Sequence, residues 1–233
     1  MKKLTLTIVC ALAATSSAFA QGTVNWLGIT PAAMTAQTNT TQASPLFGGG
    51  LTGIGAIGAA GGNASLGTGF YYELLYNTAF SGSQVAAPTT LAQLASWQDT
   101  GLTATNSNTA GRLVVVNGNI GAQVPWSPGT TNNIMLVGWS ANLGSSWLSV
   151  SNKLANGDVF STPYAFFGES ATGYISPFSD IPGAPVFGTA PGVEGLPISS
   201  LNTQLYLIVP EPSTIALAGL GGLSLLLFRR RKQ

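Results

Sequence analysis

The side chains with catalytic potential in this sequence are a few carboxylates. Glycoside hydrolysis needs two acids on either side of the scissile bond, about 5–10 Å apart, one of them with a raised pKa. The acids in the second half of the body are Asp158, Glu169, Asp180 and Glu194. Their spacing selects no pair, so a glycoside hydrolase is an alternative that two carboxylates meeting in a cleft would support.

Other catalytic chemistries lack the residues they need. The chain has no histidine, which excludes a Ser-His-Asp triad and a zinc site built on imidazole. Its one cysteine, Cys10, lies near the N-terminus, so the body has no thiol nucleophile. Asn156 and Asp158 could offer oxygens to calcium, but no EF-hand spacing surrounds them. We therefore expect a protein that is not an enzyme, with no catalytic residue, cofactor or metal site.

Residues 53–58 read Gly-Ile-Gly-Ala-Ile-Gly, and Glu73 follows twenty residues after Gly53. This spacing is typical of a dinucleotide-binding loop, which also needs a strand directly before it. Residues 45–50, Pro-Leu-Phe-Gly-Gly-Gly, make a poor strand. We therefore interpret residues 48–69 as a glycine-rich connection.

Aromatic side chains offer a second kind of site, a face on which sugar rings stack. The candidates are Trp126, Trp139, Trp147, Tyr164 and Phe166. Aromatic residues in short strands are more often part of a core. A carbohydrate-binding module is thus an alternative that exposed aromatics on one sheet face would favour and burial of all five tryptophans would exclude.

Ice binding would need a flat array of regularly spaced threonines. Thr38, Thr40 and Thr41 cluster in a polar stretch and not in a repeated ladder. An ice-binding protein is therefore a further alternative that this pattern does not favour.

The elements that must position these residues are mostly short strands separated by glycine and proline. Strands are predicted over residues 23–29, 68–76, 112–116, 120–124, 133–140, 146–150, 164–168, 173–175, 186–188 and 204–209. One helix is expected from Pro88 to Trp97, capped by Thr89 or Thr90, and residues 99–111 should be a polar connection. The pattern predicts an all-β fold, a single β-sandwich or jelly roll with one short helix.

The N-terminal segment, residues 1–20, has the features of a secretory signal peptide. Two lysines precede an apolar stretch, and Ala18 and Ala20 form a small-x-small cleavage site. The mature chain is therefore expected to begin at Gln21. Its body, residues 21–208, carries two basic and six acidic side chains, so its net charge is −4. Such a surface does not attract nucleic acid.

The C-terminal segment has three parts in a fixed order. The first is a short motif made of Val209, Pro210, Glu211 and Pro212. An uncharged apolar run at 213–228 follows, and as a helix it would span about 24 Å, slightly less than a typical bilayer core. The last part is a basic cluster of Arg229, Arg230, Arg231 and Lys232, which should stay on the cytoplasmic side and leave the body outside.

A Pro-Glu-Pro motif, a short transmembrane run and a terminal arginine cluster resemble the PEP-CTERM sorting signal, here at residues 209–233. The same kind of tail is also described as the C-terminal domain of ice-binding proteins. The resemblance implies recognition by an exosortase, a membrane-embedded processing enzyme, and transfer of the body to the cell surface or extracellular matrix. It also implies a link to exopolysaccharide and biofilm. We therefore expect an exported structural or interaction protein that is anchored in the membrane, either transiently before processing or permanently, with its body outside the cytoplasm.

Overall fold

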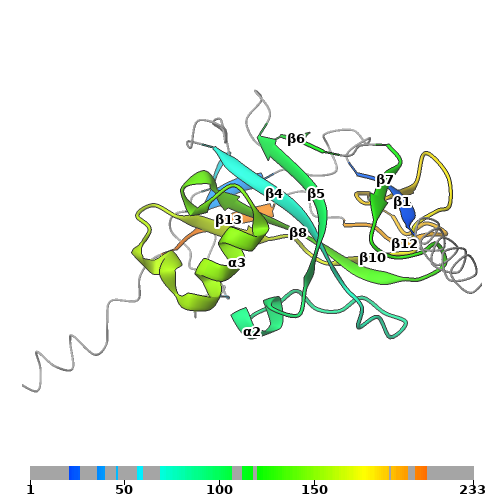
Figure 1. The fold of residues 1–233 in the computed structure, drawn as a ribbon, viewed down its shortest axis with the longest axis horizontal. Helices are drawn as coiled ribbons and strands as arrows, with labels where there is room; N and C mark the ends of the chain where they lie inside the picture. The colour runs from blue at the N-terminus through cyan, green and yellow to red at the C-terminus, as the bar shows by residue number, and fades with distance from the viewer. Residues whose placement is uncertain are drawn as a thin grey trace, which may run out of the picture.

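In the residues that it describes, the computed structural model of the chain contains two β-sheets, with two α-helices packed against the larger one (Figure 1). It describes residues 21–26, 36–39, 46, 57–59, 69–106, 112–117, 120–188, 190–198 and 203–208. The expected signal peptide, its cleavage site after Ala20, and the tail at 209–233 lie outside these residues, apart from Gln21. No helix in the described part is long and apolar enough to cross a membrane.

The larger sheet has ten strands, eight of them in the order β3-β2-β13-β9-β8-β4-β5-β6, and β10 pairs with β8 and β12. Its strands are β2 (Ala36–Asn39), β3 (Ile57–Ala59), β4 (Phe70–Asn77), β5 (Gln98–Asn106), β6 (Leu113–Val115), β8 (Asn132–Ser140), β9 (Phe166–Glu169), β10 (Gly173–Ile175), β12 (Gly195–Leu196) and β13 (Thr203–Leu207). The smaller sheet has the order β11-β1-β7, formed by β1 (Gly22–Asn25), β7 (Ala122–Val124) and β11 (Ala184–Pro185). The expectation of a mostly β body is therefore confirmed.

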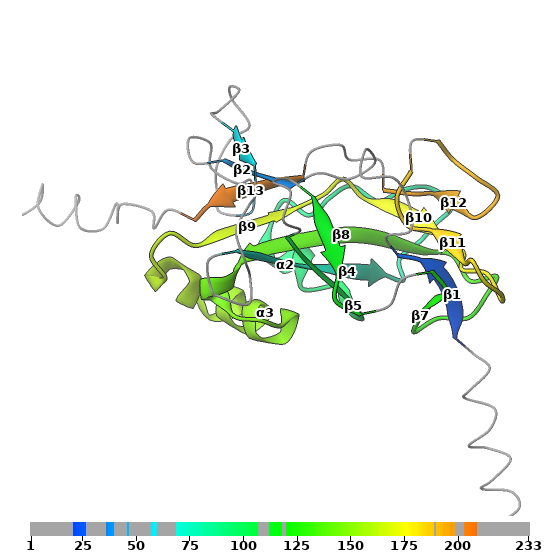
Figure 2. The same ribbon diagram turned by 90° about the horizontal axis from the view of Figure 1, so that it is seen from above.

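The central strand β8 shows that the larger sheet is buried on both faces. All nine of its residues are buried. Ile134 packs in the same cluster as Val24 of the small sheet, whereas its neighbour Met135 packs with Leu154 of a helix. Because successive side chains of a strand point to opposite faces, β8 lies between two apolar layers. The small sheet contributes to one of these layers and the helices to the other. Figure 2 shows the small sheet and α3 toward opposite ends of the larger sheet.

The helix α3 (Trp147–Asn156) replaces the strand that was predicted over 146–150. The Ser146 hydroxyl accepts a hydrogen bond from the N–H of Ser149 at 3.4 Å, and Gly157 ends the helix in a left-handed conformation with φ 77°. Its buried residues recur at helical spacing and are Trp147, Val150 and Leu154. The five residues 146–150, Ser-Trp-Leu-Ser-Val, are too short a run to distinguish a strand from a helix. The helical period becomes visible only when the window extends to the third buried residue.

Two other predicted elements differ from the structure. The helix α2 covers only Leu91–Leu94, and its cap is Thr90, whose hydroxyl accepts the N–H of Gln93 at 3.2 Å. The polar connection expected over 99–111 is wrong in its first part, because β5 continues to Asn106. Pairing with β4 on one side and β6 on the other stabilises this polar sequence as a strand.

Candidate functional site

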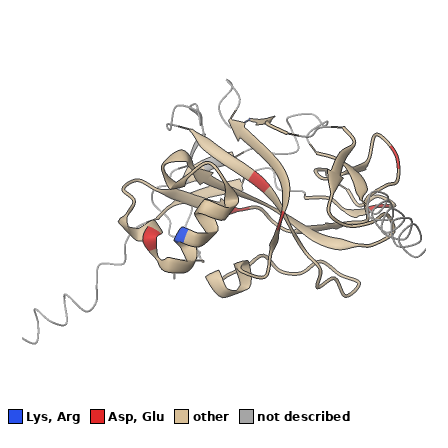
Figure 3. Cartoon of the chain, in the orientation of Figure 1, with Lys and Arg blue, Asp and Glu red and all other residues tan. Residues whose placement is uncertain are grey.

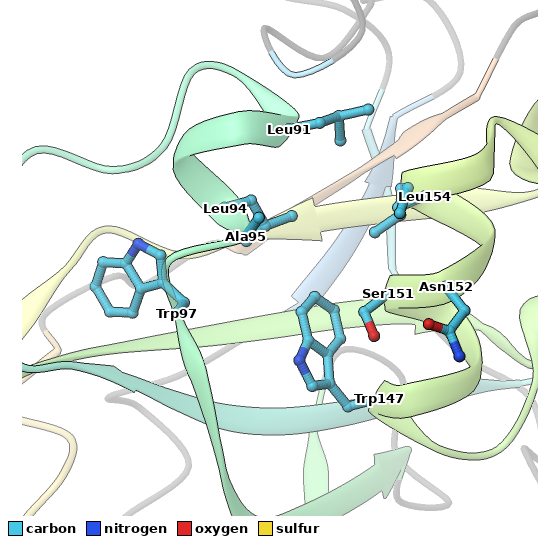
Figure 4. Close-up of a pocket in the computed structure, with 9 residues that line it drawn as sticks. Leu91, Leu94, Ala95, Trp97, Trp147, Ser151, Asn152 and Leu154 are labelled. Carbon is cyan, nitrogen blue, oxygen red and sulfur yellow. The ribbon is translucent and has the colours of Figure 1, made fainter.

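A groove lies between α2 and α3 in the described part of the chain. Its volume is about 300 Å³, at the lower end of the range for small-molecule pockets. The lining side chains come from the two helices and from the residues between α2 and β5, and they are Leu91, Leu94, Ala95, Trp97, Trp147, Ser151, Asn152, Leu154 and Ala155. Figure 4 shows Leu94 and Ala95 opposite Leu154, with the ring of Trp147 between Trp97 and Ser151 in this view.

The groove can hold an apolar group but offers no acid or base. None of its lining side chains titrates near neutral pH. The Ser151 hydroxyl donates to the backbone oxygen of Leu148 at 3.2 Å, within its own helix. This groove therefore contains neither a nucleophile–base pair nor a pair of carboxylates.

A pair of carboxyl groups lies next to this groove, formed by the buried Glu73 on β4 and the exposed Asp99 on β5. Glu73 is 2% exposed. Burial raises the pKa of Glu73 to about 9; a hydrogen bond with the Asp99 side chain and the negative charge of Asp99 add to the increase, and the backbone N–H of Trp147 opposes it. Glu73 is therefore protonated at neutral pH. Through these interactions the Glu73 side chain on β4 contacts β5 and the start of α3.

A second carboxyl group, that of the half-buried Glu169 on β9, lies on the same sheet face. Glu73 pairs with Val137 of β8, and Val137 pairs with Glu169, so the three side chains point the same way. Two strand spacings put the Cα atoms of the two acids about 10 Å apart. Burial raises the pKa of Glu169 to about 8, and its Oε2 atom has no hydrogen-bond partner among the described residues.

The four acids singled out by the sequence do not assemble into a hydrolase site. Asp158 begins the 3-10 helix η5 (Asp158–Ser161), Asp180 lies between β10 and β11, and Glu194 precedes β12. The pair that does meet consists of Glu73 and Asp99, which are 26 positions apart in the sequence. Their contact depends on the register of β4 with β5, and no sequence spacing could reveal it.

The tryptophans form no exposed stacking face. All five are buried, with exposures of 0% for Trp26, 6% for Trp97, 6% for Trp126, 1% for Trp139 and 7% for Trp147. Trp139 packs against Trp147 with ring centroids 6.0 Å apart, and Trp126 stacks on Tyr76 at 4.9 Å. These rings fill the two apolar layers, as aromatic residues in short strands usually do.

The two remaining aromatic candidates differ in their exposure to solvent. Phe166 is half-buried and meets Phe70 edge to face at 5.9 Å. Tyr164, two residues earlier, is 81% exposed and has a positive φ of 52°. A single exposed ring makes no platform for a sugar chain.

The glycine, threonine and calcium candidates fall only partly within the described residues. Gly58 belongs to β3, so the described end of the glycine motif is a strand and not the helix that a dinucleotide site needs. Thr38 lies on β2 between β3 and β13, whereas Thr40 and Thr41 lie outside the described residues. Asn156 ends α3, and the structure places no further carboxylate cluster beside it among the residues it describes.

The last described strand leads directly into the predicted sorting motif. β13 lies inside the sheet, parallel to β2 and antiparallel to β9. Ile208 follows it with only 3% exposure, and its N–H donates to the oxygen of Ala165 at 2.7 Å. The motif begins at the next residue, Val209. The folded body and the motif are therefore joined without a spacer.

Comparison with known protein families identifies the segment that follows this junction. Residues 209–232 match the model of the PEP-CTERM protein-sorting motif. The chain is therefore a PEP-CTERM sorting domain-containing protein, and the segment is an exosortase-dependent sorting signal. No curated protein and no solved structure is significantly similar to the chain.

Proposed function

We propose that the protein is an exported, non-enzymatic surface or matrix protein whose body is delivered by an exosortase-type enzyme acting on the C-terminal segment. The observation that carries the proposal is the PEP-CTERM match at residues 209–232, directly after the last strand of the body. Residues 1–20 supply the export signal, and the run at 213–228 holds the chain in the membrane before processing. The basic residues at 229–232 keep its end on the cytoplasmic side.

The absence of an acid or base from the groove supports a structural or interaction role. Its lining side chains are apolar apart from a serine hydroxyl, an asparagine amide and the indole N–H groups of two tryptophans. An exopolysaccharide partner, and with it a place in a biofilm, rests on the family resemblance alone, because the buried tryptophans supply no stacking face.

The experiment that tests this proposal replaces Pro210, Glu211 and Pro212 with alanine in a host that contains an exosortase. We expect the variant to stay in the membrane at unprocessed size, while the unaltered protein reaches the surface or medium with a lower mass. Pro191→Ala, in an exposed loop of the body, is the matched control and should be processed normally. Processing of the triple variant to the same mass at the same rate would contradict the proposal.

A further inference from the structure

The place where the chain leaves the body is fixed by backbone hydrogen bonding. Ile208 is buried, and its N–H donates to the oxygen of Ala165 at 2.7 Å. Ala165 is itself completely buried. The exit point of the tail is therefore held beside Tyr164, the residue directly before Ala165.

The tail is too short to let this end of the body move far from a membrane. Five residue steps separate Ile208 from Ser213, where the apolar run begins. A fully extended chain covers at most about 18 Å over that length. The headgroup layer of a bilayer takes up roughly 5–8 Å of that distance. Side chains next to the exit point are therefore within reach of the headgroups while the tail is inserted.

Tyr164 is the side chain that this position exposes. It is 81% exposed, whereas each tryptophan is at most 7% exposed. Its left-handed backbone, φ 52°, is fixed from both sides, because Asn142 Nδ2 donates to the oxygen of Pro163 at 2.8 Å and Ala165 is anchored in the core. Tyr164 therefore keeps an unfavourable backbone conformation, in which its ring points outward.

The segment around Tyr164 suits contact with lipid. Residues 159–168 contain no charged side chain, and the exposed Asp158 and half-buried Glu169 lie at the two ends of this segment. Approach of the segment itself to the bilayer therefore desolvates no ion. Charges are few and scattered over the described part of the molecule (Figure 3). Tyrosine, with an apolar ring and a polar hydroxyl, favours the interface between headgroups and hydrocarbon.

We propose that the end of the body around Tyr164 is a membrane-facing surface, and that the Tyr164 ring inserts among the lipid headgroups while the tail spans the bilayer. This inference rests on the proposed function, since it requires the apolar run to be in the membrane. The ring and the tail then form two contacts on one side of the body.

The test uses the chain exported in a host without an exosortase, purified from the envelope and reconstituted in phosphatidylethanolamine–phosphatidylglycerol vesicles. Cleavage of the signal peptide on export removes Cys10, the one native cysteine, and Tyr164→Cys carries an environment-sensitive fluorophore. Val193→Cys is the matched control: Val193 is 98% exposed and lies two residues before β12, which is at the far end of the molecule from the exit of β13 in Figures 1 and 2. Flotation of the vesicles reports insertion of the tail.

We expect lipids with nitroxide headgroups to quench roughly half or more of the fluorescence at position 164 and to leave position 193 unchanged. Equal quenching at both positions, in chains that float with the vesicles, would overturn the membrane-facing surface and leave the proposed function standing. Chains that do not float would overturn both. Because these vesicles contain no other protein, quenching there reports lipid and not a contact with the processing enzyme.

Discussion

Glu73 on β4 and Asp99 on β5 are hydrogen-bonded through their carboxyl groups. The contact depends on an irregularity in the pairing of the two strands between Glu73 and Leu75. The backbone N–H of Trp147 also donates to Glu73, at the start of α3. One buried carboxyl group therefore connects two strands of the sheet to the helical layer.

This pair predicts that stability falls as pH rises. The pKa of Glu73 is raised from 4.5 to about 9 in the folded chain, so between these values the folded chain keeps a proton that the unfolded chain releases. The free energy of unfolding should then decrease by up to about 1.4 kcal/mol per pH unit for this group. Urea unfolding followed between about pH 5 and pH 8 measures the slope.

Glu73→Gln should flatten that slope, because the amide does not titrate and still donates to Asp99. The difference in free energy of unfolding, variant minus unaltered chain, should therefore be at least about 1 kcal/mol larger at pH 8 than at pH 5. Asp99→Asn is the companion variant, and it should lower the pKa of Glu73 by removing the negative charge. An unchanged slope in Glu73→Gln would show that Glu73 is ionised in the folded protein.

Glu169 should make a second contribution to the pH dependence of stability, and this contribution should end at a lower pH than that of Glu73. Burial raises its pKa from 4.5 to about 8, so Glu169→Gln should remove part of the pH dependence below pH 8 and have little effect on the slope above it. The exposed Asp158→Asn is the control and should leave the unfolding curve unaltered. The prediction fails if both variants give the same curve.

Gly168 should tolerate no side chain. A Cβ atom at this position on β9 would overlap the backbone oxygen of Gln204 on β13. Gly168→Ala must move β13 away from β9, and we expect it to lower the free energy of unfolding by roughly 2–4 kcal/mol. Gly82→Ala is the control, since nothing lies within 4 Å of the added carbon and only its positive φ of 92° opposes the change. That cost should be about 1 kcal/mol.

The Gly168→Ala comparison also tests whether the tail depends on the sheet. Because β13 ends one residue before Ile208, a displaced β13 changes where the chain leaves the body. Thermal unfolding measures the loss of stability. The processed fraction in a host with an exosortase measures the effect on the tail. Equal stability of the two glycine variants would contradict the close approach of β9 and β13.

Tyr164→Asn should stabilise the body in solution. Asparagine adopts the left-handed conformation more readily than tyrosine, and the exposed ring contributes little packing, so the free energy of unfolding should rise by about 0.5–1 kcal/mol. Tyr164→Phe keeps the same backbone demand and should leave the stability unchanged. A loss of stability in Tyr164→Asn would mean that the ring packs on the body and does not point away from it.

The sequence alone was sufficient for the sorting signal and for the mostly β character of the body. The sorting signal is readable because its three parts are contiguous, and the family match at 209–232 confirms it. The strand predicted over 133–140 corresponds closely to β8, whose β-branched and aromatic residues favour a pleated sheet. Patterns of this kind depend on residues that are close together in the sequence, so they can be recognised without knowing the tertiary contacts.

Tertiary structure alone decided the relationships between distant residues. The helix α3 was mistaken for a strand because its period needs the full span to Leu154, and β5 was missed because its polar residues form a strand only when paired. The Glu73–Asp99 pair and the position of Ala165 beside Ile208 depend on strand register. Register is set by which side chains fit together in the core, and this information is spread over the whole chain.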